Sequence, residues 1–456
     1  MIYSVFTVLL NAGPTVMLPV IMFVIGLIFR VKPAKAFRSG LTIGIGFAGI
    51  KLIIGLLSSN LGPAAQAMVK NFGLKLDVLD IGWGAIAAIT WSSPIIPILI
   101  FVILITNVVM LILKKTNTLD VDIWNYHHMA IVGVMTYFVT KNIGLGIAAT
   151  VTMGIVTFKM SDWSEHLVSG YFELPGVSLP TVSALSSLII AVPLNWVLDK
   201  IPGINKITFQ AKDAKKYLGL FGEPMIMGLI LGGVIGALAK YDITKILTVA
   251  VNMAAVMVLI PKMTSLFMEG LMPISEAAKK FTKSKFKGRK FLIGLDAAVV
   301  VGSSEVITTS LIVIPLTIAL AVMLPGNRVL PFADLAVVPF RIALVVALTD
   351  GNVLKNIIIG LACTGAILLA GTNTAPVLTN LAKHSGIDLS LAAGALISSF
   401  AATSLTLSFI VYKVFTGNVF ITLPIFLVAF IAIWVYIEVI KKKKQLEVEP
   451  EANFTE

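Results

Sequence analysis

The chain has 456 residues, of which 57% are hydrophobic and only 13% are charged. Soluble globular chains carry about 25% charged residues, whereas apolar runs of about 20 residues, long enough to cross a bilayer core about 30 Å thick, recur here from end to end. The composition excludes a soluble protein and predicts a multi-pass membrane protein. The net charge of +12 lies in short loops between the runs, where it orients helices. We therefore expect no nucleic-acid partner.

The apolar runs predict an all-α fold. They cover residues 5–29, 39–59, 81–113, 129–158, 179–198, 217–239, 243–261, 291–325, 335–371, 389–413 and 418–440. Several runs are too long for one straight span and are interrupted by Gly, Pro or a Lys-Asn pair. Interrupted segments are tolerated at membrane depth where protein or a water-filled cavity satisfies the backbone. We expect roughly 10–11 transmembrane helices plus two re-entrant hairpins.

Short motifs recur in the same order along the chain at nearly one offset. TKNIGLGIAAT, starting at Thr140, aligns without gaps with LKNIIIGLACT, which starts at Leu354, 214 residues later. GVSL, starting at Gly176, aligns with GIDL, which starts at Gly386, 210 residues later. One short match could arise by chance, but several at nearly one offset predict a duplicated unit.

The loop charges indicate how the two units sit in the membrane. Loop 30–38 carries four basic residues and its partner near 240–245 carries two, whereas 66–80 carries two and its partner 276–290 carries seven. Because Lys and Arg mark the cytoplasmic side, equivalent loops face opposite sides. The sequence therefore predicts inverted repeats, with the N-terminus outside and the C-terminus in the cytoplasm. Inverted repeats are typical of alternating-access transporters, whose site lies at the repeat interface near the midplane.

The predicted boundaries follow from the repeats. They are a first repeat at 1–200, a linker at 201–216, a second repeat at 217–413, a final transmembrane helix at 414–440 and a cytoplasmic tail at 441–456.

Polar residues inside apolar runs are candidates for a substrate site because they are costly in a membrane. The first candidates are His127 and His128, which follow Trp124 and Tyr126 at the entry to a long apolar run. Two imidazoles there can donate and accept hydrogen bonds to hydroxyl groups without a fixed charge. The alternative is an interfacial belt, since Trp and Tyr favour headgroup depth. A metal site is disfavoured because adjacent helical side chains diverge by about 100°.

A second cluster appears once in each repeat. Trp91, Ser92 and Ser93 follow Gly82-Trp83-Gly84, and the partner segment runs from Asp296 to Glu305. Carboxylates can accept hydrogen bonds from the hydroxyls of a polyol, and an indole face can pack on its C–H surface. The alternative is that both carboxylates are loop-end charges paired with helix N-termini or Lys.

The third cluster is a pair of short polar segments, 161–166 and 371–376, at similar places in the two repeats. They contain the candidate residues Asp162, Asn373 and Thr374. Each is flanked by apolar sequence, as expected of a re-entrant hairpin tip whose backbone lines a cavity. Ordinary loops outside the membrane would look similar.

Motifs for other chemistries are absent from the sequence. There is no phosphate-cradling glycine loop, no Ser/His/Asp order and no zinc signature, so we expect no cofactor, no metal and no catalytic residue in this chain. The one cysteine, Cys363, lies inside an apolar run and matches Ala149 in the other repeat. An apolar helix is not where a reactive thiolate would be placed.

The opening NAGPTVMLPVIMFVIGLI and the following VKPAKAFRSGLTIGIGF closely resemble the membrane IIC component of the galactitol-type phosphotransferase system. LDVDIWNYHHMAI, GLDAAVVVGSSEV and AGTNTAPVLTNLAKHSGIDLS resemble the same family, so the resemblance covers most of the chain. These components are more distantly similar to the ascorbate permeases of the same system. Those permeases are dimers of inverted repeats with a V-shaped scaffold and a mobile core.

The resemblance implies that the chain binds a polyol, galactitol in the first place, and moves it inward by an elevator-like shift of the core. Release would follow phosphorylation by a phosphocysteine on a separate IIB chain, which a separate IIA chain serves. The resemblance also implies a homodimer with lipid around it, a scaffold at 5–59 and 217–261, and a core at 81–198 and 291–413. In the ascorbate relatives a His-His pair contributes to the substrate site, and His127-His128 stands in a similar context.

Two points stay open at this stage. The basic loops 30–38 and 276–290 fit docking surfaces for IIA and IIB, but solvated positive-inside loops would look the same. A secondary transporter coupled to H⁺ or Na⁺, with Asp296, Glu305 and the histidines as a relay, is the alternative function. A passive channel is disfavoured by the polar segments.

Overall fold

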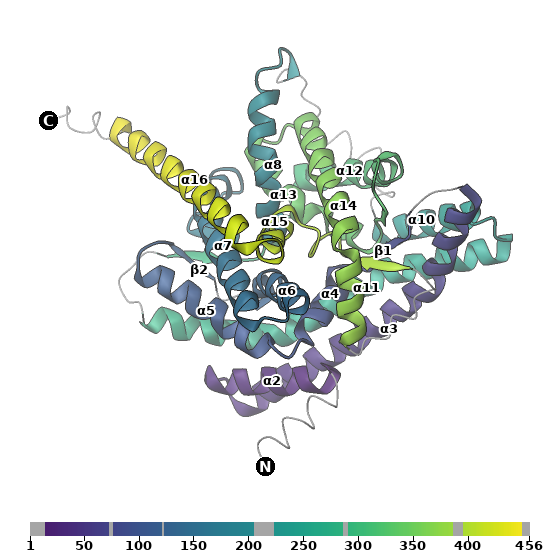
Figure 1. The fold of residues 1–456 in the computed structure, drawn as a ribbon, viewed down its shortest axis with the longest axis horizontal. Helices are drawn as coiled ribbons and strands as arrows, with labels where there is room; N and C mark the ends of the chain where they lie inside the picture. The colour runs from purple at the N-terminus through teal and green to yellow at the C-terminus, as the bar shows by residue number, and fades with distance from the viewer. Residues whose placement is uncertain are drawn as a thin grey trace.

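The structure is a computed structural model, and it describes residues 14–72, 76–120, 123–204, 223–285, 291–385 and 395–448. Within these ranges the chain is mostly helical, with six short strands (Figure 1). The prediction of a helical protein is confirmed in outline. The strands depart from the all-α prediction, because segments of two or three residues leave no alternating pattern in a sequence.

The described elements are as follows. The helices of the first half are α2 (Pro14–Ile28), α3 (Pro33–Phe72), α4 (Trp83–Trp91), α5 (Ile96–Ile112), α6 (Ile123–Thr140), α7 (Ile143–Tyr171) and α8 (Val182–Leu198). Those of the second half are α10 (Pro224–Leu238), α11 (Ile243–Lys285), α12 (Ser304–Met323), α13 (Val338–Leu348), α14 (Val353–His384), α15 (Thr406–Thr416) and α16 (Val419–Val448), with 3₁₀ helices η3 (Ala297–Val299) and η4 (Ala333–Val337). The strands are β1 (Val78–Asp80), β2 (Thr118–Asp120), β3 (Val177–Ser178), β4 (Leu292–Gly294), β5 (Val329–Leu330) and β6 (Leu396–Ser398).

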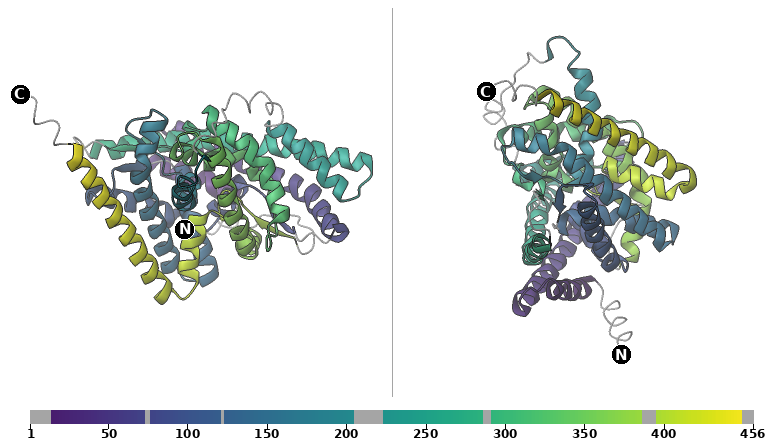
Figure 2. Two further views of the ribbon diagram at one scale, coloured as in Figure 1. Left: turned by 90° about the horizontal axis from the view of Figure 1, so that it is seen from above. Right: turned by 90° about the vertical axis from the view of Figure 1, so that its left-hand side faces the viewer.

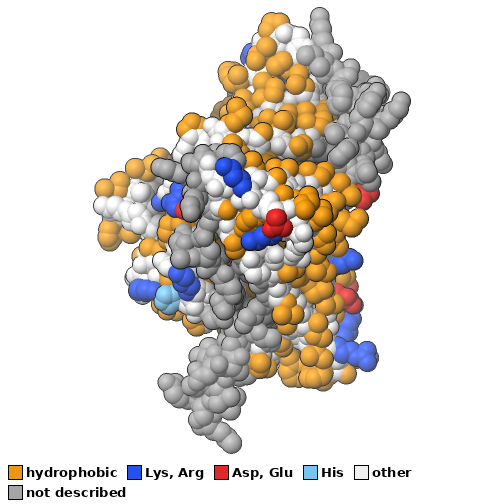
Figure 3. Space-filling view, turned by 90° about the vertical axis from the view of Figure 1, so that its right-hand side faces the viewer, with side chains coloured by type: hydrophobic (Ala, Val, Ile, Leu, Met, Phe, Trp, Pro, Cys, Tyr) orange, Lys and Arg blue, Asp and Glu red, His pale blue; other side chains and the backbone are white. Residues whose placement is uncertain are grey.

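Apolar helices of membrane-spanning length occur in both halves of the described chain. Four of them can cross a bilayer by length and composition, namely α7, α12 from Glu305, α14 and α16, and the pair α4–α5, bent by 103°, is a fifth candidate. Apolar side chains on the outer surface are widely exposed, and Phe420 of α16 is 89% exposed. Figure 3 shows hydrophobic side chains covering much of one face of the molecule. Exposed apolar area on this scale fits contact with lipid.

The described residues contain fewer full-length spans than the roughly 10–11 predicted from hydropathy. The predicted run 81–113 is divided at Ser92-Ser93-Pro94, where α4 and α5 meet at the sharp bend. The run 335–371 is divided between α13 and α14, where Asp350 and Gly351 have φ angles of 51° and 77°. Both runs are too long for one straight span, and they break at a Pro and at a Gly, as the sequence indicated.

Helices α2, α3, α10 and α11 pack against one another along one side of the molecule (Figures 1 and 2). Helices α3 and α11 have 40 and 43 residues and end at Phe72 and Lys285. The first parts of the predicted loops 66–80 and 276–290 are therefore helical, and the loop prediction is wrong for those parts. Both helices continue past the apolar run because the segments that follow contain residues that favour helix, which are Ala, Gln, Met and Lys in α3 and Ala, Glu and Lys in α11.

Glycines allow α10 to approach α11 closely. A Cβ atom at Gly228 would lie 2.7 Å from the Cα atom of Ala254, and one at Gly232 would lie 2.7 Å from the Cα atom of Ala250. Small residues four apart on one helix face let two backbones come together in a membrane. The α10–α11 pair therefore depends on the absence of side chains at these positions.

The six strands form two parallel three-stranded sheets that exchange their central strands. In one sheet β1, from the first half of the chain, lies between β5 and β6 from the second half. In the other, β4 from the second half lies between β2 and β3 from the first. Each half of the chain thus completes a sheet of the other half.

An ion pair supports the first of these sheets where β1 and β5 begin. The guanidinium of Arg328 donates from Nε to Oδ1 of Asp77 at 2.8 Å, and its Nη2 bonds to Oδ2. Hydrogen bonding to Arg328 lowers the pKa of the Asp77 carboxyl below its ordinary value. The two residues are 251 positions apart in the chain, so the pair joins the two halves.

Both segments predicted as re-entrant hairpin tips are helical, and that prediction is wrong for these residues. Residues 161–166 lie within α7 and residues 371–376 within α14. The hydroxyl groups in these segments donate to backbone carbonyls one turn earlier in the same helix. Ser161 donates to the carbonyl of Thr157 at 2.9 Å, and Thr374 donates to the carbonyl of Ala370 at 3.1 Å. Ser and Thr can remain inside a helix when they satisfy their polarity in this way.

Some predictions fall partly outside the described residues. They concern most of the linker 201–216, the end of the basic loop 276–290, the motif at 386–389 and the last residues of the tail 441–456. The predicted tail boundary shifts, because α16 continues to Val448.

The close approach of α10 and α11 makes a testable prediction. We expect Gly232→Ala to lower stability by about 1–3 kcal/mol, because the new methyl group would overlap the backbone of α11. The measurement is thermal unfolding of the purified protein in detergent.

Gly233→Ala is the matched control. Its Cβ would lie 3.9 Å from the nearest atom, so the melting temperature should stay at the wild-type value or rise slightly. Equal melting temperatures for the two variants would contradict the packing described here.

Candidate substrate site

A pocket lies where the carboxyl ends of the two sheets face each other. All strands within a sheet are parallel, so the chain leaves all three strands at one edge, which is where ligands bind in open parallel sheets. The segments after β1, β5 and β6 supply Trp83, Val337, Phe340 and Ala401 to the lining. The segments after β2, β3 and β4 supply His128, Thr181, Ser183 and Asp296. All six strands therefore lead into one site.

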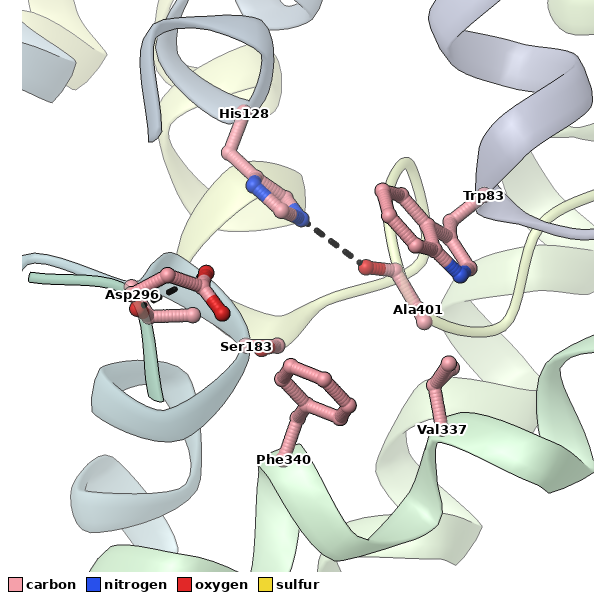
Figure 4. Close-up of a pocket in the computed structure, with 8 residues that line it drawn as sticks. Trp83, His128, Ser183, Asp296, Val337, Phe340 and Ala401 are labelled. Atoms are coloured by element: carbon pink, nitrogen blue, oxygen red, sulfur yellow. Dashed lines mark hydrogen bonds between the residues drawn. The ribbon is translucent and has the colours of Figure 1, made fainter. Parts of the chain in front are cut away.

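The pocket encloses an empty volume of about 310 Å³, which includes space open at its mouth. Figure 4 shows Trp83 and Phe340 facing the interior with Asp296 on the opposite side. The site thus combines aromatic faces with a small number of polar groups.

Asp296 is held by the first residues of η3 and by Thr181, which directly precedes α8. Its Oδ1 accepts a hydrogen bond from the amide of Ala298 at 2.8 Å, and its Oδ2 accepts from the hydroxyl of Thr181 at 3.3 Å. The Thr181 hydroxyl in turn accepts from the amide of Ala297 at 2.8 Å. The side chain is 8% exposed. Because a carboxylate can accept about four hydrogen bonds, the oriented group can also accept from a ligand.

His128 connects the two sides of the pocket. Its Nε2 lies 3.2 Å from the carbonyl oxygen of Ala401 (Figure 4). A carbonyl can only accept, so Nε2 carries the hydrogen, and Nδ1 of the neutral ring is an acceptor. Nδ1 is buried and has no hydrogen-bond partner among the described residues. His128 therefore offers a second acceptor for a ligand hydroxyl.

The structure brings His128 and Asp296 together at the pocket and places the other candidates elsewhere. His127 is fully buried beside His128, with ring centroids 4.9 Å apart, but it does not line the pocket. Trp91, Ser92 and Ser93 lie at the bend between α4 and α5. Glu305 lies in the first turn of α12, outside the lining of the pocket.

Asp162 has a structural role away from the pocket. Its Oδ1 accepts hydrogen bonds from the Thr118 amide at 3.1 Å and the Thr118 hydroxyl at 2.9 Å, and the Asn117 amide also donates to the carboxylate. A largely buried carboxylate is costly without a compensating charge, and the ammonium of Lys159 lies 3.9 Å from Oδ2 of Asp162. Lys159 also pairs with Glu438 of α16 at 3.4 Å. Asp162 therefore ties the start of β2 to α7, and Lys159 ties α7 to α16.

Asn373 and Thr374 also lie outside the lining of the pocket. Asn373 is exposed on α14 and accepts from the Lys413 ammonium at 3.4 Å, whereas Thr374 is fully buried in the helix. We predicted these two residues as site residues from their polarity alone. They lie outside the pocket lining because the segment that contains them is a continuous part of α14.

Several lining residues were not among the candidates from sequence, namely Trp83, Thr181, Ser183, Val337, Phe340 and Ala401. Trp83 lies in a motif that the sequence does mark, Gly82-Trp83-Gly84. The other lining residues share no sequence motif. They have in common only that they lie in segments that follow a strand, so they can be identified as lining residues only when the strands are known.

Comparison with known proteins identifies the family. The family EIIC-GAT, described as PTS system sugar-specific permease component, matches residues 8–393. The chain belongs to this family. Being a permease component with several apolar helices of spanning length, this EIIC-GAT chain is a multi-pass membrane protein.

Individual relatives agree with the family assignment. The chain is 39% identical to the PTS system galactitol-specific EIIC component of Escherichia coli K12 over 416 residues, which cover 91% of this chain and 92% of the relative. The component of the same name from Escherichia coli O157:H7 matches equally well. Another permease IIC component of Escherichia coli K12, whose name states no substrate, is 36% identical over 84% of this chain and 88% of its own length.

The position of Asp162 makes a prediction about stability. We expect Asp162→Ala to destabilise the protein by about 1–3 kcal/mol, because buried donors at the start of β2 lose their acceptor. The readout is the melting temperature in detergent. Glu165→Ala, in the next turn of α7, is the control, because the Glu165 side chain makes no hydrogen bond or ion pair within the described residues. An equal melting temperature for Asp162→Ala and the control would contradict the assignment.

Proposed function

We propose that this chain binds galactitol in the pocket between the two sheets and carries it across the membrane as the IIC component of a phosphotransferase system. The observation that carries the proposal is the lining of the pocket. It offers acceptors at Asp296 and His128 and apolar faces at Trp83 and Phe340, and no Lys or Arg is among its described residues.

This lining fits an uncharged polyol. The hydroxyl groups of a polyol donate to carboxylate and imidazole acceptors, and its C–H surface packs on aromatic rings. An anion such as ascorbate would meet the Asp296 carboxylate without a compensating cation in the lining. The name of the 39% identical relatives supports galactitol as the polyol.

The phosphoryl group would come from separate IIB and IIA chains. The thiol of Cys363 is 1% exposed, lies in α14 and packs 3.6 Å from the carbonyl oxygen of Ser187. A thiol enclosed between two helices cannot reach a phosphate donor in another protein. This supports a division of labour in which the present chain binds and moves the polyol and IIB carries the phosphocysteine.

The exchanged strands support an inverted repeat. β1 and β4, which begin 214 residues apart, are the central strands of the two sheets, and each lies between strands of the other half. In this proposal α2, α3, α10 and α11 form the scaffold and the surface of a homodimer, and the helices around the sheets form the core that moves as an elevator. The N-terminus faces outward and the C-terminus faces the cytoplasm, as the loop charges indicate.

The pocket geometry predicts the effect of removing one charge. Asp296→Asn should weaken galactitol binding about 10-fold or more, because hydrogen bonds to a charged acceptor contribute about 1.5–3 kcal/mol. The measurement is equilibrium binding of radiolabelled galactitol to purified protein in detergent.

Glu305→Gln serves as the matched control for the carboxylate, since Glu305 lies outside the pocket lining. Its affinity should stay within about twofold of wild type. Wild-type affinity in a folded Asp296→Asn protein would remove Asp296 from the site.

Vectorial phosphorylation tests the function itself. Membrane vesicles containing this chain, supplied on the cytoplasmic side with phosphorylated IIA protein and with IIB protein, should convert labelled galactitol to a phosphate ester. An uncoupler should not prevent the conversion. Accumulation of unmodified galactitol that collapses with an uncoupler would instead establish an ion-coupled secondary transporter.

A further inference from the structure

A second buried carboxylate, Asp334 of η4, lies just behind the pocket wall. It is fully buried and does not line the pocket. Its Oδ1 accepts from the amide of Trp83 at 2.7 Å. Its Oδ2 accepts from the hydroxyl of Ser399 at 2.7 Å and from the amide of Ala401 at 2.8 Å. One side chain therefore joins the segments that follow β1, β5 and β6.

The partners of Asp334 form the wall of the pocket. Trp83 and Ala401 line it directly and lie together on one side of the site (Figure 4). Val337 and Phe340 follow Asp334 within two turns of the same segment and line it as well. The Ala401 carbonyl, next to the amide that Asp334 holds, accepts from His128. Asp334 thus sets the relative positions of four lining residues and of the acceptor that orients the imidazole.

The neighbouring carboxylate, Asp80, has a different set of partners. It accepts from the amides of Gly82, Phe332, Asp334 and Phe400 at 2.9–3.3 Å. None of these residues lines the pocket. Asp80 therefore stabilises the edge of the sheet, whereas Asp334 contacts the residues that a ligand would meet.

A buried cation accompanies the two carboxylates. The guanidinium of Arg341 is 3% exposed, lies 4.3 Å from the ring centroid of Phe400 and donates to the Thr364 hydroxyl at 3.1 Å. It interacts electrostatically with both Asp334 and Asp80. Because an isolated buried charge is costly, this cation helps Asp334 to remain an acceptor that binds three donors.

We propose that Asp334 is the positioning residue that determines which hexitol the pocket accepts. Hexitols are stereoisomers with the same number of hydroxyl groups, so discrimination depends on the relative placement of acceptors and apolar faces. Asp296 contacts the ligand from one sheet, and Asp334 fixes the opposite wall from the other. The inference rests on the proposed function, because it concerns the selectivity of the same site.

The test measures selectivity rather than affinity alone. Dissociation constants for galactitol and mannitol are compared in wild type, Asp334→Asn and Ser399→Ala. The amide of Asn keeps one acceptor oxygen, but its NH₂ group faces one of the donors that Asp334 binds. We therefore expect Asp334→Asn to reduce the ratio of the dissociation constant for mannitol to that for galactitol at least fivefold. Ser399→Ala, which removes one hydrogen bond to Asp334, should lower the ratio in the same direction by a smaller factor.

Two controls separate positioning from general loss of structure. Ser404→Ala removes a buried hydroxyl in the same loop that bonds to Ser398 at 3.1 Å and not to Asp334, so the ratio should remain at the wild-type value. Glu305→Gln changes a carboxylate outside the lining of the pocket, so this variant should also keep the wild-type ratio. An unchanged ratio in both folded Asp334→Asn and folded Ser399→Ala would overturn the proposal.

Hydrogen exchange gives a readout that needs no ligand. In Asp334→Asn, and to a smaller extent in Ser399→Ala, peptides covering 81–85 and 398–403 should exchange faster, whereas a peptide covering 176–184 in the other sheet should not. Unchanged exchange at 81–85 and 398–403 would also overturn the proposal. If wild type binds neither hexitol, the proposed function fails, and the exchange data still decide whether Asp334 positions the wall.

Discussion

The exchange of central strands is the constraint on which the rest of the structure depends. Because β1 pairs with β5 and β6, and β4 pairs with β2 and β3, neither half of the chain can complete a sheet alone. Parallel pairing then directs all six strand ends toward one space, and the residues that follow them line the pocket. The site is therefore a product of the whole fold, and the ion pair between Asp77 and Arg328 stabilises the same junction.

Buried carboxylates solve the problem that these strand ends create. Backbone amides just beyond a strand have no partner in the sheet, and an unsatisfied amide in an apolar environment is costly. Asp80 and Asp334 accept from such amides in one sheet, and Asp296 does so in the other. The two sheets differ in one respect, since Asp296 also lines the pocket whereas Asp334 lies behind the wall. The carboxylate on one side of the pocket is thus part of its lining, whereas the carboxylate on the other side supports the lining residues from behind.

The sequence predicted the membrane class, the family and two pocket residues, His128 and Asp296, because hydropathy, motifs and isolated polar residues are local signals. It could not predict the strands, since two or three residues show no periodicity, and therefore it missed Thr181 and Ala401. Asp334 lies in an apolar segment, yet nothing near it in sequence indicates its partners 65 and 67 positions away. Ser161 and Thr374 were misread as loop residues because their hydroxyls bond within their own helices.

The most direct test of this account is an electron cryomicroscopy structure of the purified protein with galactitol. The account predicts ligand density between the two sheets, with hydroxyl groups within hydrogen-bond distance of the Asp296 carboxylate and of Nδ1 of His128, and with the carbon chain against Trp83 and Phe340. Galactitol bound saturably at another place, with this pocket empty, would contradict the claim that the exchanged strands build the substrate site.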